Sequence, residues 1–353
     1  SKDGVTILPY DSIYEYVKTF EKDMTVLLCK KKANCRLVNS IPKEVTILDE
    51  ANLTFLPKSI KNPVEVENER IAHIKDGVAL TKFICWLKKN AGKIPMTELS
   101  VGEKLYSFRA QQENFIDNSF DPIISYGIHA AINHYSATPE TDIAIEPGNF
   151  LLADTGGHYY EGTTDTTRTI VMGSVNDEQK KYFTAVLRGM LNLGNAKFRY
   201  GCTGVNLDYL ARGPLWEMGQ DFNHGTGHGV GYLLNVHEGP NSFRWRIIQG
   251  DNAVLEEGMI TSDEPGYYVE NQYGIRHENL LVCKKAEKTT FGQFMCFEHL
   301  TMVPFDLDAV VPELMTVQER ALLNNYHAQV YKKISPYLEE EEKEWLKEAT
   351  REI

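Results

Sequence analysis

Two aspartates stand at either end of a glycine-rich segment. Asp154 follows the apolar run of residues 150–152, and Asp165 precedes the strand-like run of residues 169–172. Two strands joined by a glycine-containing connection form a hairpin, which can bring the two carboxylates to face each other across the ladder. Two carboxylates at such a short distance repel one another unless a cation or a proton neutralises them. Aspartate is also common in turns, so the pair alone favours a structural role.

Three histidines follow within fourteen residues, at positions 224, 228 and 237. Four glycines lie among residues 224–231, which makes a regular helix improbable there. His224 and His228 are therefore not the i, i+4 helical pair of a zincin. Glycine more readily lets the backbone approach a crowded centre. Together with His237, the spacing indicates a site.

Two glutamates follow these histidines. The turn signal Pro265-Gly266 places Glu264 at a strand end. We expect Glu278 inside a strand, because apolar residues 280–282 follow it, and a carboxylate that enters a core needs a partner. Arg276 shares its side-chain direction by the two-residue strand period, so a simple Arg276–Glu278 salt bridge remains an equal alternative to a site.

Taken together, these features amount to four carboxylates and at least one imidazole on β elements. This is a hard, oxygen-rich ligand set. It is typical of a site for divalent ions such as Mn²⁺ and not of a structural zinc site built from thiolates. Two metals roughly 3.5–4 Å apart can clamp and deprotonate a bridging water for hydrolysis.

The composition restricts the partners. The 353 residues include 37 Lys and Arg against 49 Asp and Glu, a net charge of −12. That balance argues against a nucleic-acid-binding face. No apolar run approaches membrane-spanning length, and the first residues do not form a secretory signal. The six cysteines form no CxxC pair, so we expect free thiols in a reducing cytoplasm.

The elements that must position these side chains follow from periodicity and turn signals. A small α/β unit is expected first, with strands at 5–8, 25–28 and 45–48 and a helix at 11–20. Lys61-Asn62-Pro63 marks a boundary before a long amphipathic helix. Further helices are expected from Ser100, over 177–198 and 205–218, and after Thr316 and Ser335, around β-rich segments at 123–171 and 223–303. This arrangement predicts an α+β fold.

Four strings carry a resemblance to a known family. They are DTGGHYYEGTTDTTRT (154–169), HGTGHGVGYLLNVHEGP (224–240), DEPGYY (263–268) and GIRHEN (274–279). In order and spacing they resemble the Xaa-Pro aminopeptidase (aminopeptidase P) family in its large, eukaryote-like form. The resemblance implies the pita-bread fold shared with prolidase, methionine aminopeptidase and creatinase, with a curved, mainly antiparallel sheet flanked by helices. It implies a catalytic domain over 63–353, with a helical tail over 306–353. Residues 1–62 would be the C-terminal remnant of a creatinase-type N-terminal domain, a partial α/β domain.

The resemblance also implies residue roles. Metal ligands would be Asp154, Asp165, His228, Glu264 and Glu278, with Asp165 and Glu278 bridging two divalent ions. Mn²⁺ is favoured over Zn²⁺ and Co²⁺. Glu264, His134 and His237 would be catalytic, and His134, His224 and His237 would contact the substrate. Arg276 would orient the ligating carboxylates from behind.

The implied reaction is hydrolysis, by a metal-bridging hydroxide, of the bond between an N-terminal residue and a following proline. A cytoplasmic homodimer acting on such peptides, without nucleic-acid or membrane partners, is expected. Two alternatives stay open: a prolidase-like dipeptidase and a non-catalytic binding module of the same fold. His277 departs from the apolar residue expected between Arg276 and Glu278, and we expect its side chain to point away from the metals.

Overall fold

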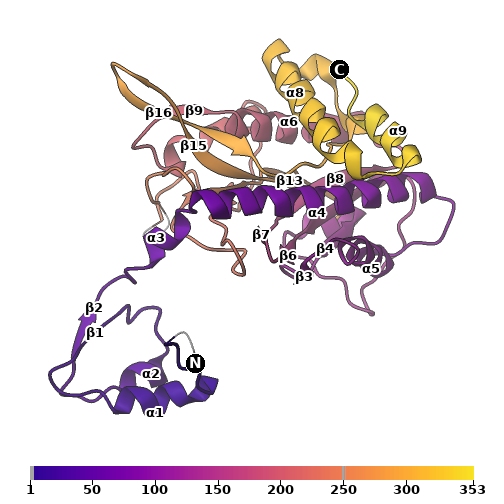
Figure 1. Cartoon of the computed structure of the whole chain (residues 1–353). Helices are drawn as coiled ribbons and strands as arrows, with labels where there is room; N and C mark the ends of the chain where they lie inside the picture. Colours follow the sequence, from indigo (N-terminus) through magenta and orange to yellow (C-terminus); the bar gives the residue numbers. More distant parts are fainter. Residues whose placement is uncertain (1–3, 249, 251) are drawn as a thin grey trace. The chain divides into compact units, whose positions relative to one another are not determined.

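The computed structural model describes residues 4–248, 250 and 252–353, which divide into two units. The first unit is Ser1–Lys58 and the second is Ser59–Ile353. Figure 1 colours the first unit indigo and the second from purple to yellow. The boundary lies four residues before the one that the sequence places at 62/63.

The first unit is built around two parallel strands, β1 (Thr25–Leu28) and β2 (Thr46–Asp49), with α2 (Cys35–Ser40) between them in the chain. η1 (Tyr10–Ser12) and α1 (Ile13–Lys18) precede them, and α3 (Phe55–Ser59) follows. The strand expected at 5–8 is wrong: these residues are exposed and have no strand assignment. A strand needs a hydrogen-bonded neighbour, and β1 and β2 pair with each other.

The second unit begins with the long helix α4 (Pro63–Asn90). Asn62 caps it in a capping box with Glu65, and Pro63 takes the first helical position, as the boundary signal predicts. The next helix, α5 (Glu98–Arg109), begins earlier than expected. Its cap is Thr97, whose side chain accepts from the Ser100 backbone N–H, so Ser100 is the third helical residue and not the cap.

Antiparallel strands form the centre of this unit. β4 (Ile123–Tyr126), β5 (Asn149–Thr155) and β8 (Thr166–Met172) make one sheet, and β12 (Ile260–Asp263), β15 (Asn279–Thr289), β16 (Gly292–His299) and β9 (Lys197–Arg199) make another. Shorter pairings complete the arrangement: β3 (Phe115–Asn118) with β6 (Gly157–Tyr159), β6 with β7 (Gly162–Thr163), β10 (Gly227–His228) with β11 (Ser242–Phe243), and β13 (Gly266–Val269) with β14 (Tyr273–Arg276).

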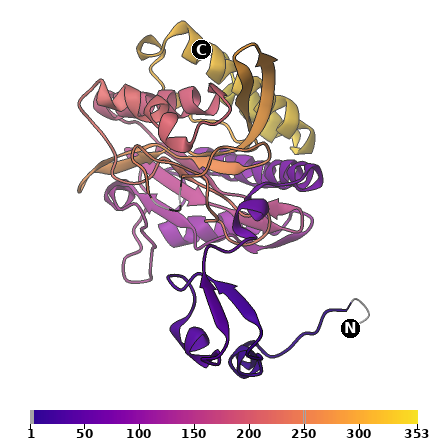
Figure 2. The same cartoon turned by 90° about the vertical axis from the view of Figure 1, so that its left-hand side faces the viewer.

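Helices cover these strands on both sides. α6 (Asp177–Gly194), α7 (Tyr209–Trp216), α8 (Val317–Ile334) and α9 (Glu340–Ala349) carry much of the core. Phe150 of β5 packs there with Phe183 of α6 and Leu323 of α8. Figure 1 shows β8 and β13 between α6 and α8 on one side and α5 on the other, and Figure 2 shows the same layers from another side. The predicted α+β class is confirmed.

Three predicted helices differ in extent. α6 ends at Gly194 because β9 begins at Lys197, and the segment 205–218 divides into η3 (Gly204–Asn206) and α7. After Ser335 only the short η6 (Ser335–Tyr337) forms, and α9 starts at Glu340. The other 3₁₀ turns are η2 (Gly127–Ala131), η4 (Leu307–Ala309) and η5 (Pro312–Leu314). Among the described residues, no helix combines the length and the apolar character that crossing a bilayer requires.

Candidate metal centre

A cavity of about 630 Å³ opens among the strands of the second unit. Its walls include every side chain that the sequence singled out for chemistry: Asp154, Asp165, His134, His224, His228, His237, Glu264, Arg276 and Glu278. These residues come from segments more than a hundred positions apart, so the fold gathers them into one place.

The two aspartates reach the cavity from adjacent strands, but they do not lie opposite each other. β5 pairs with β8 so that Asp154 faces Thr167, while Asp165 stands just before β8. The expected face-to-face register is wrong because the pair β6–β7 occupies the connection and moves Asp165 out of the ladder. One carboxylate oxygen of Asp154, Oδ1, is buried and lacks a hydrogen-bond partner within the described part of the chain.

The sequence predicted that Glu278 lies inside a strand, and this prediction is wrong. His277 and Glu278 form a two-residue break between β14 and β15. The break arises because β14 pairs with β13, whereas β15 pairs with β12 and β16, so the chain changes partners there. The Thr167 hydroxyl donates to Glu278 Oε2 at 2.8 Å, and the Glu278 backbone N–H donates to the Thr167 carbonyl at 3.1 Å.

His228 stands among the carboxylates. Its Nε2 lies 3.5 Å from Asp165 Oδ2 and 3.5 Å from Glu264 Oε1. Potential ligand atoms of Asp165, His228 and Glu278 all lie within 4.8 Å of one another, a spacing that could hold a metal ion. The neighbouring glycines make this approach possible, since a Cβ on Gly227 would come within 1.8 Å of the Ser262 carbonyl oxygen.

The ionisable groups of this cluster have strongly shifted pKa values. Burial raises the pKa of Asp165, raises that of Glu264 to about 7, and raises that of Glu278 well above its usual range. The neighbouring carboxylates add to each rise. Burial alone would lower the pKa of His228, but the Asp165 hydrogen bond and the charges of Glu264 and Asp165 raise it to about 9. Ionising all of these carboxyl groups together is therefore unfavourable unless a further cation lies among them.

Arg276 joins Asp154 and not Glu278. Its Nη2 donates to Asp154 Oδ2 at 2.6 Å and its Nη1 donates to the Tyr268 hydroxyl at 2.7 Å. Because no Arg276–Glu278 ion pair occurs among the described residues, the simple salt bridge that the sequence left open is wrong. Arg276 holds one oxygen of Asp154 and leaves Oδ1 for another partner.

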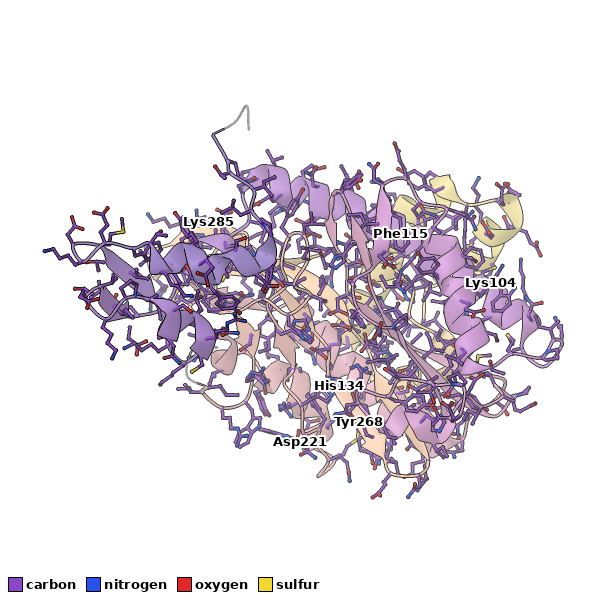
Figure 3. The ribbon with its side chains drawn as sticks, turned by 90° about the horizontal axis from the view of Figure 1, so that it is seen from below. Lys104, Phe115, His134, Asp221, Tyr268 and Lys285 are labelled. Carbon is purple, nitrogen blue, oxygen red and sulfur yellow. The ribbon has the colours of Figure 1, made fainter. Side chains whose placement is uncertain are left out.

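The other histidines line the same walls without joining the carboxylates. The rings of His237 and His228 lie 4.2 Å apart, nearly perpendicular. Burial lowers the pKa of His237 to about 4 and that of His224 to about 3, so both are neutral near pH 7. His134 lies on the cavity wall (Figure 3).

Sequence reasoning missed Tyr268 and Thr167 as members of the site. Tyr268, also labelled in Figure 3, bridges His224 Nε2 at 2.9 Å and Arg276. It stands inside the string DEPGYY, where it could have been noticed. Thr167 shares the face of Asp165 by the two-residue period, which is the signal that could have found it.

His277 is fully buried and packs edge-on against Phe183, with ring centroids 4.3 Å apart, and against Phe305 at 5.5 Å. It does not line the cavity. Its side chain therefore lies away from the carboxylates, as the sequence predicts.

Comparison with known proteins identifies the family. The model of metallopeptidase family M24 matches residues 67–285, the C-terminal region of peptidase M24 matches 293–353, and the creatinase/prolidase N-terminal domain matches 1–65. This chain belongs to metallopeptidase family M24.

Individual relatives narrow the likeness. The chain is 40% identical to a probable Xaa-Pro aminopeptidase P of Arthroderma otae over 99% of its own length, and 38% identical to aminopeptidase P1 of Arabidopsis thaliana over 90%. It spans 58% and 53% of those two proteins, so it matches a little over half of their length. The resemblance to the Xaa-Pro aminopeptidases that the motifs indicated is confirmed.

Solved structures agree on the fold. An X-prolyl aminopeptidase from Caenorhabditis elegans, described as a cytosolic enzyme with a di-nuclear active site, superposes with a TM-score of 0.90 at 34% identity. That alignment covers 100% of this chain and 59% of the nematode protein. A prolidase from Pyrococcus furiosus superposes with a TM-score of 0.63 at 26% identity, covering 84% and 80% of the two chains. The pita-bread fold predicted from the motifs is confirmed.

Proposed function

We propose that this chain carries the catalytic centre of a dinuclear-metal aminopeptidase that hydrolyses the bond between an N-terminal residue and a following proline. The observation that supports this most directly is the cavity in which Asp165, His228 and Glu278 bring ligand atoms within 4.8 Å of one another. Relatives named Xaa-Pro aminopeptidase, and a structural neighbour described as di-nuclear, support the same reaction.

The residues fit two divalent ions. Asp165 and Glu278 would bridge both, Asp154 would hold one, and His228 with Glu264 would hold the other. The free Oδ1 of Asp154 and the crowded carboxylates are what such ions would satisfy. Carboxylate oxygens with one imidazole favour Mn²⁺, with Zn²⁺ and Co²⁺ as further candidates. When bound, the ions would supply an activated water as nucleophile and polarise the scissile carbonyl.

The chain's own residues would handle protons and substrate. Glu264 would accept the proton of the attacking water, and Glu264 or a histidine would deliver a proton to the proline nitrogen as the C–N bond breaks. His237 is neutral near pH 7, so its imidazole N–H can donate to the substrate carbonyl oxygen as negative charge develops there. His134 and His224 would contact the bound peptide from the same walls.

Proline selection would come from shape. An Xaa–Pro bond is a tertiary amide whose nitrogen carries no hydrogen, and its ring is fixed. The apolar side chains on the cavity wall are Phe120, Ile123 and Val236. They offer a surface on which that ring can pack, in place of a hydrogen-bond acceptor for a peptide N–H.

The context of the domain is part of the proposal. Residues 1–62 would be the C-terminal part of a creatinase-type N-terminal domain, which the family match over 1–65 supports. Residues 63–353 would be the catalytic domain with its helical tail over 306–353. A homodimer in the cytoplasm would act on peptides, and the net charge of −12 supports the absence of a nucleic-acid partner.

A prolidase-like dipeptidase is the second candidate, because prolidases share the fold at 26% identity. The non-catalytic module is less well supported, since every candidate ligand position holds a ligating residue.

A peptide series tests the function. The Mn²⁺-loaded chain is incubated with Ala-Pro, Ala-Pro-Ala and the matched control Ala-Ala-Ala, and released alanine is measured. The proposal predicts cleavage of Ala-Pro-Ala and little cleavage of the control. Cleavage of the dipeptide alone would support the dipeptidase, and no cleavage of any peptide by a metal-loaded chain would contradict both.

A further inference from the structure

Arg168 of β8 is a buried cation directly behind the candidate metal centre. Only 1% of its surface is exposed, and its guanidinium stacks on Phe305, 4.0 Å from the ring centroid. Within the described chain it makes no ion pair with a carboxylate, and its donors are used on neutral acceptors. These acceptors are the carbonyl oxygens of Thr167, Glu278, Val303 and Pro304, the Asn279 side chain and the Tyr326 hydroxyl.

The position of two of these acceptors is informative. One nitrogen, Nη1, donates to the Glu278 carbonyl at 2.6 Å and to the Thr167 carbonyl at 2.8 Å. Glu278 lies in the break where β14 ends and β15 has not begun, so no strand ladder includes it. Arg168 therefore donates to the Glu278 carbonyl oxygen, while the N–H of the same residue bonds Thr167 of β8.

The opposite end of Glu278 is held from the same strand. Thr167, the neighbour of Arg168, donates its hydroxyl to Glu278 Oε2 at 2.8 Å and accepts the Glu278 backbone N–H. Successive strand residues point to opposite faces, so Thr167 fixes the carboxylate on the cavity side while Arg168 fixes the carbonyl on the buried side. Two consecutive residues thereby set both the position and the direction of this glutamate.

The other terminal nitrogen of Arg168, Nη2, bonds residues at and beyond the start of β15. Nη2 donates to Asn279 Oδ1 at 2.8 Å and to the Val303 carbonyl at 2.8 Å. A planar fork can meet several fixed acceptors at once, whereas a lysine ammonium is a compact point charge on a flexible stem. The geometry therefore requires arginine and not only positive charge.

We propose that Arg168 is a positioning residue for the metal centre: it holds the peptide of Glu278 in the strand break so that the carboxylate is aimed at the position between two ions. This inference rests on the proposed bridging role of Glu278. Arg168 does not line the cavity, so its effect would be transmitted through Glu278 and through Thr167, whose carbonyl oxygens it contacts.

The test is a Co²⁺ titration of the metal-free chain, followed by visible absorption, which resolves the two binding steps and the geometry of the bound ion. We compare wild type with Arg168→Lys and Arg168→Gln. Outer partners of metal ligands typically change affinity or activity by about 10–100-fold. We expect Arg168→Lys to weaken the second step about tenfold and Arg168→Gln to weaken it more, with kcat falling and KM almost unchanged.

Arg109→Lys is the matched control, because Arg109 is equally buried and bonds Asp76 and Thr155 without reaching Glu278. It should lose comparable thermal stability while both Co²⁺ steps stay within about twofold of wild type. If Arg168→Gln does not fold, Arg168→Lys decides the matter, since it keeps the charge and one donor toward the Glu278 carbonyl.

Two results would overturn the inference in distinguishable ways. Wild-type Co²⁺ binding and kcat in Arg168→Lys, beside a Glu278→Gln variant that has lost the second ion, would refute the positioning role and leave the proposed function intact. Wild-type binding in Glu278→Gln would refute both, because Glu278 would then not be a bridging ligand.

Discussion

Two buried carboxylates, Asp76 and Glu278, are equally hidden from solvent, at 2% exposure each, yet the protein treats them oppositely. Asp76 accepts from Arg109 Nε at 2.7 Å and from the Tyr159 hydroxyl at 3.0 Å. The Glu278 carboxylate accepts from the neutral Thr167 hydroxyl, and its charged neighbours include other acids. A buried charge normally needs a matched partner. Arg109 is that partner for Asp76, whereas Glu278 has no arginine or lysine ion pair within the described chain, which supports the proposal that Glu278 binds a metal ion.

The largest effect on activity should come from changing a carboxylate of the candidate metal centre. Asp165→Asn removes a proposed bridging ligand without changing side-chain size. We expect kcat/KM to fall about a thousandfold or more, with reduced metal content and an unchanged circular dichroism spectrum. The exposed Asp308→Asn serves as control. Near-normal turnover in Asp165→Asn would refute the bridging role.

At the Asp76–Arg109 pair we expect the opposite result, a loss of stability with little change in turnover. Asp76→Asn leaves the Arg109 guanidinium buried without its anion, which should cost about 3–5 kcal/mol in the free energy of unfolding. Turnover per folded molecule should stay close to wild type, because Asp76 lies outside the cavity. Urea unfolding and active-site titration measure the two quantities. A large loss of turnover with unchanged stability would contradict the comparison.

The pH dependence of the metal-free chain separates the two regions further. Burial raises the pKa of Glu264 to about 7, whereas an unfolded glutamate titrates near 4.3, at roughly its model value. The native state therefore retains a proton that the unfolded state releases, and this group lowers stability as pH rises from about 4.3 towards 7. Glu264→Gln should match wild type below that window and become more stable above it. The reverse trend in urea unfolding would contradict the electrostatic account.

A smaller effect is expected at His277. Both ring nitrogens are buried, and burial with the nearby Arg168 charge lowers the pKa to about 3, although an interaction with the Phe183 backbone opposes this shift. The unfolded chain takes up a proton near pH 6.5 that the native state refuses, so wild type loses stability as pH falls from there towards 3. His277→Ile should gain about 1 kcal/mol at pH 7 and more at pH 5. A net loss in thermal unfolding at both pH values would show that the imidazole contributes an interaction of its own.

The sequence was informative wherever local chemistry decides. Pro63 after Asn62 predicts where α4 begins, and the glycines around His228 indicate a crowded backbone. The side chains predicted to do chemistry do line one cavity.

Pairing between distant strands was less accessible from sequence. The shift that sets Asp154 opposite Thr167, and the break that holds Glu278, both depend on which strands become neighbours. That Arg276 pairs with Asp154 and not with Glu278 also depends on which strands become neighbours. A two-residue period says which face a side chain takes, but not which side chain stands across from it.

Within the described chain Asp165, Glu264 and Glu278 form no ion pair with a lysine or arginine, and we propose that two metal ions complete this cluster instead. Equilibrium dialysis of the chain against Mn²⁺, followed by elemental analysis, tests it most directly. The account predicts two tightly held ions per folded wild-type chain and at most one in Asp165→Asn. A folded wild-type chain that retains no ion, or that binds equally many in both forms, would contradict it.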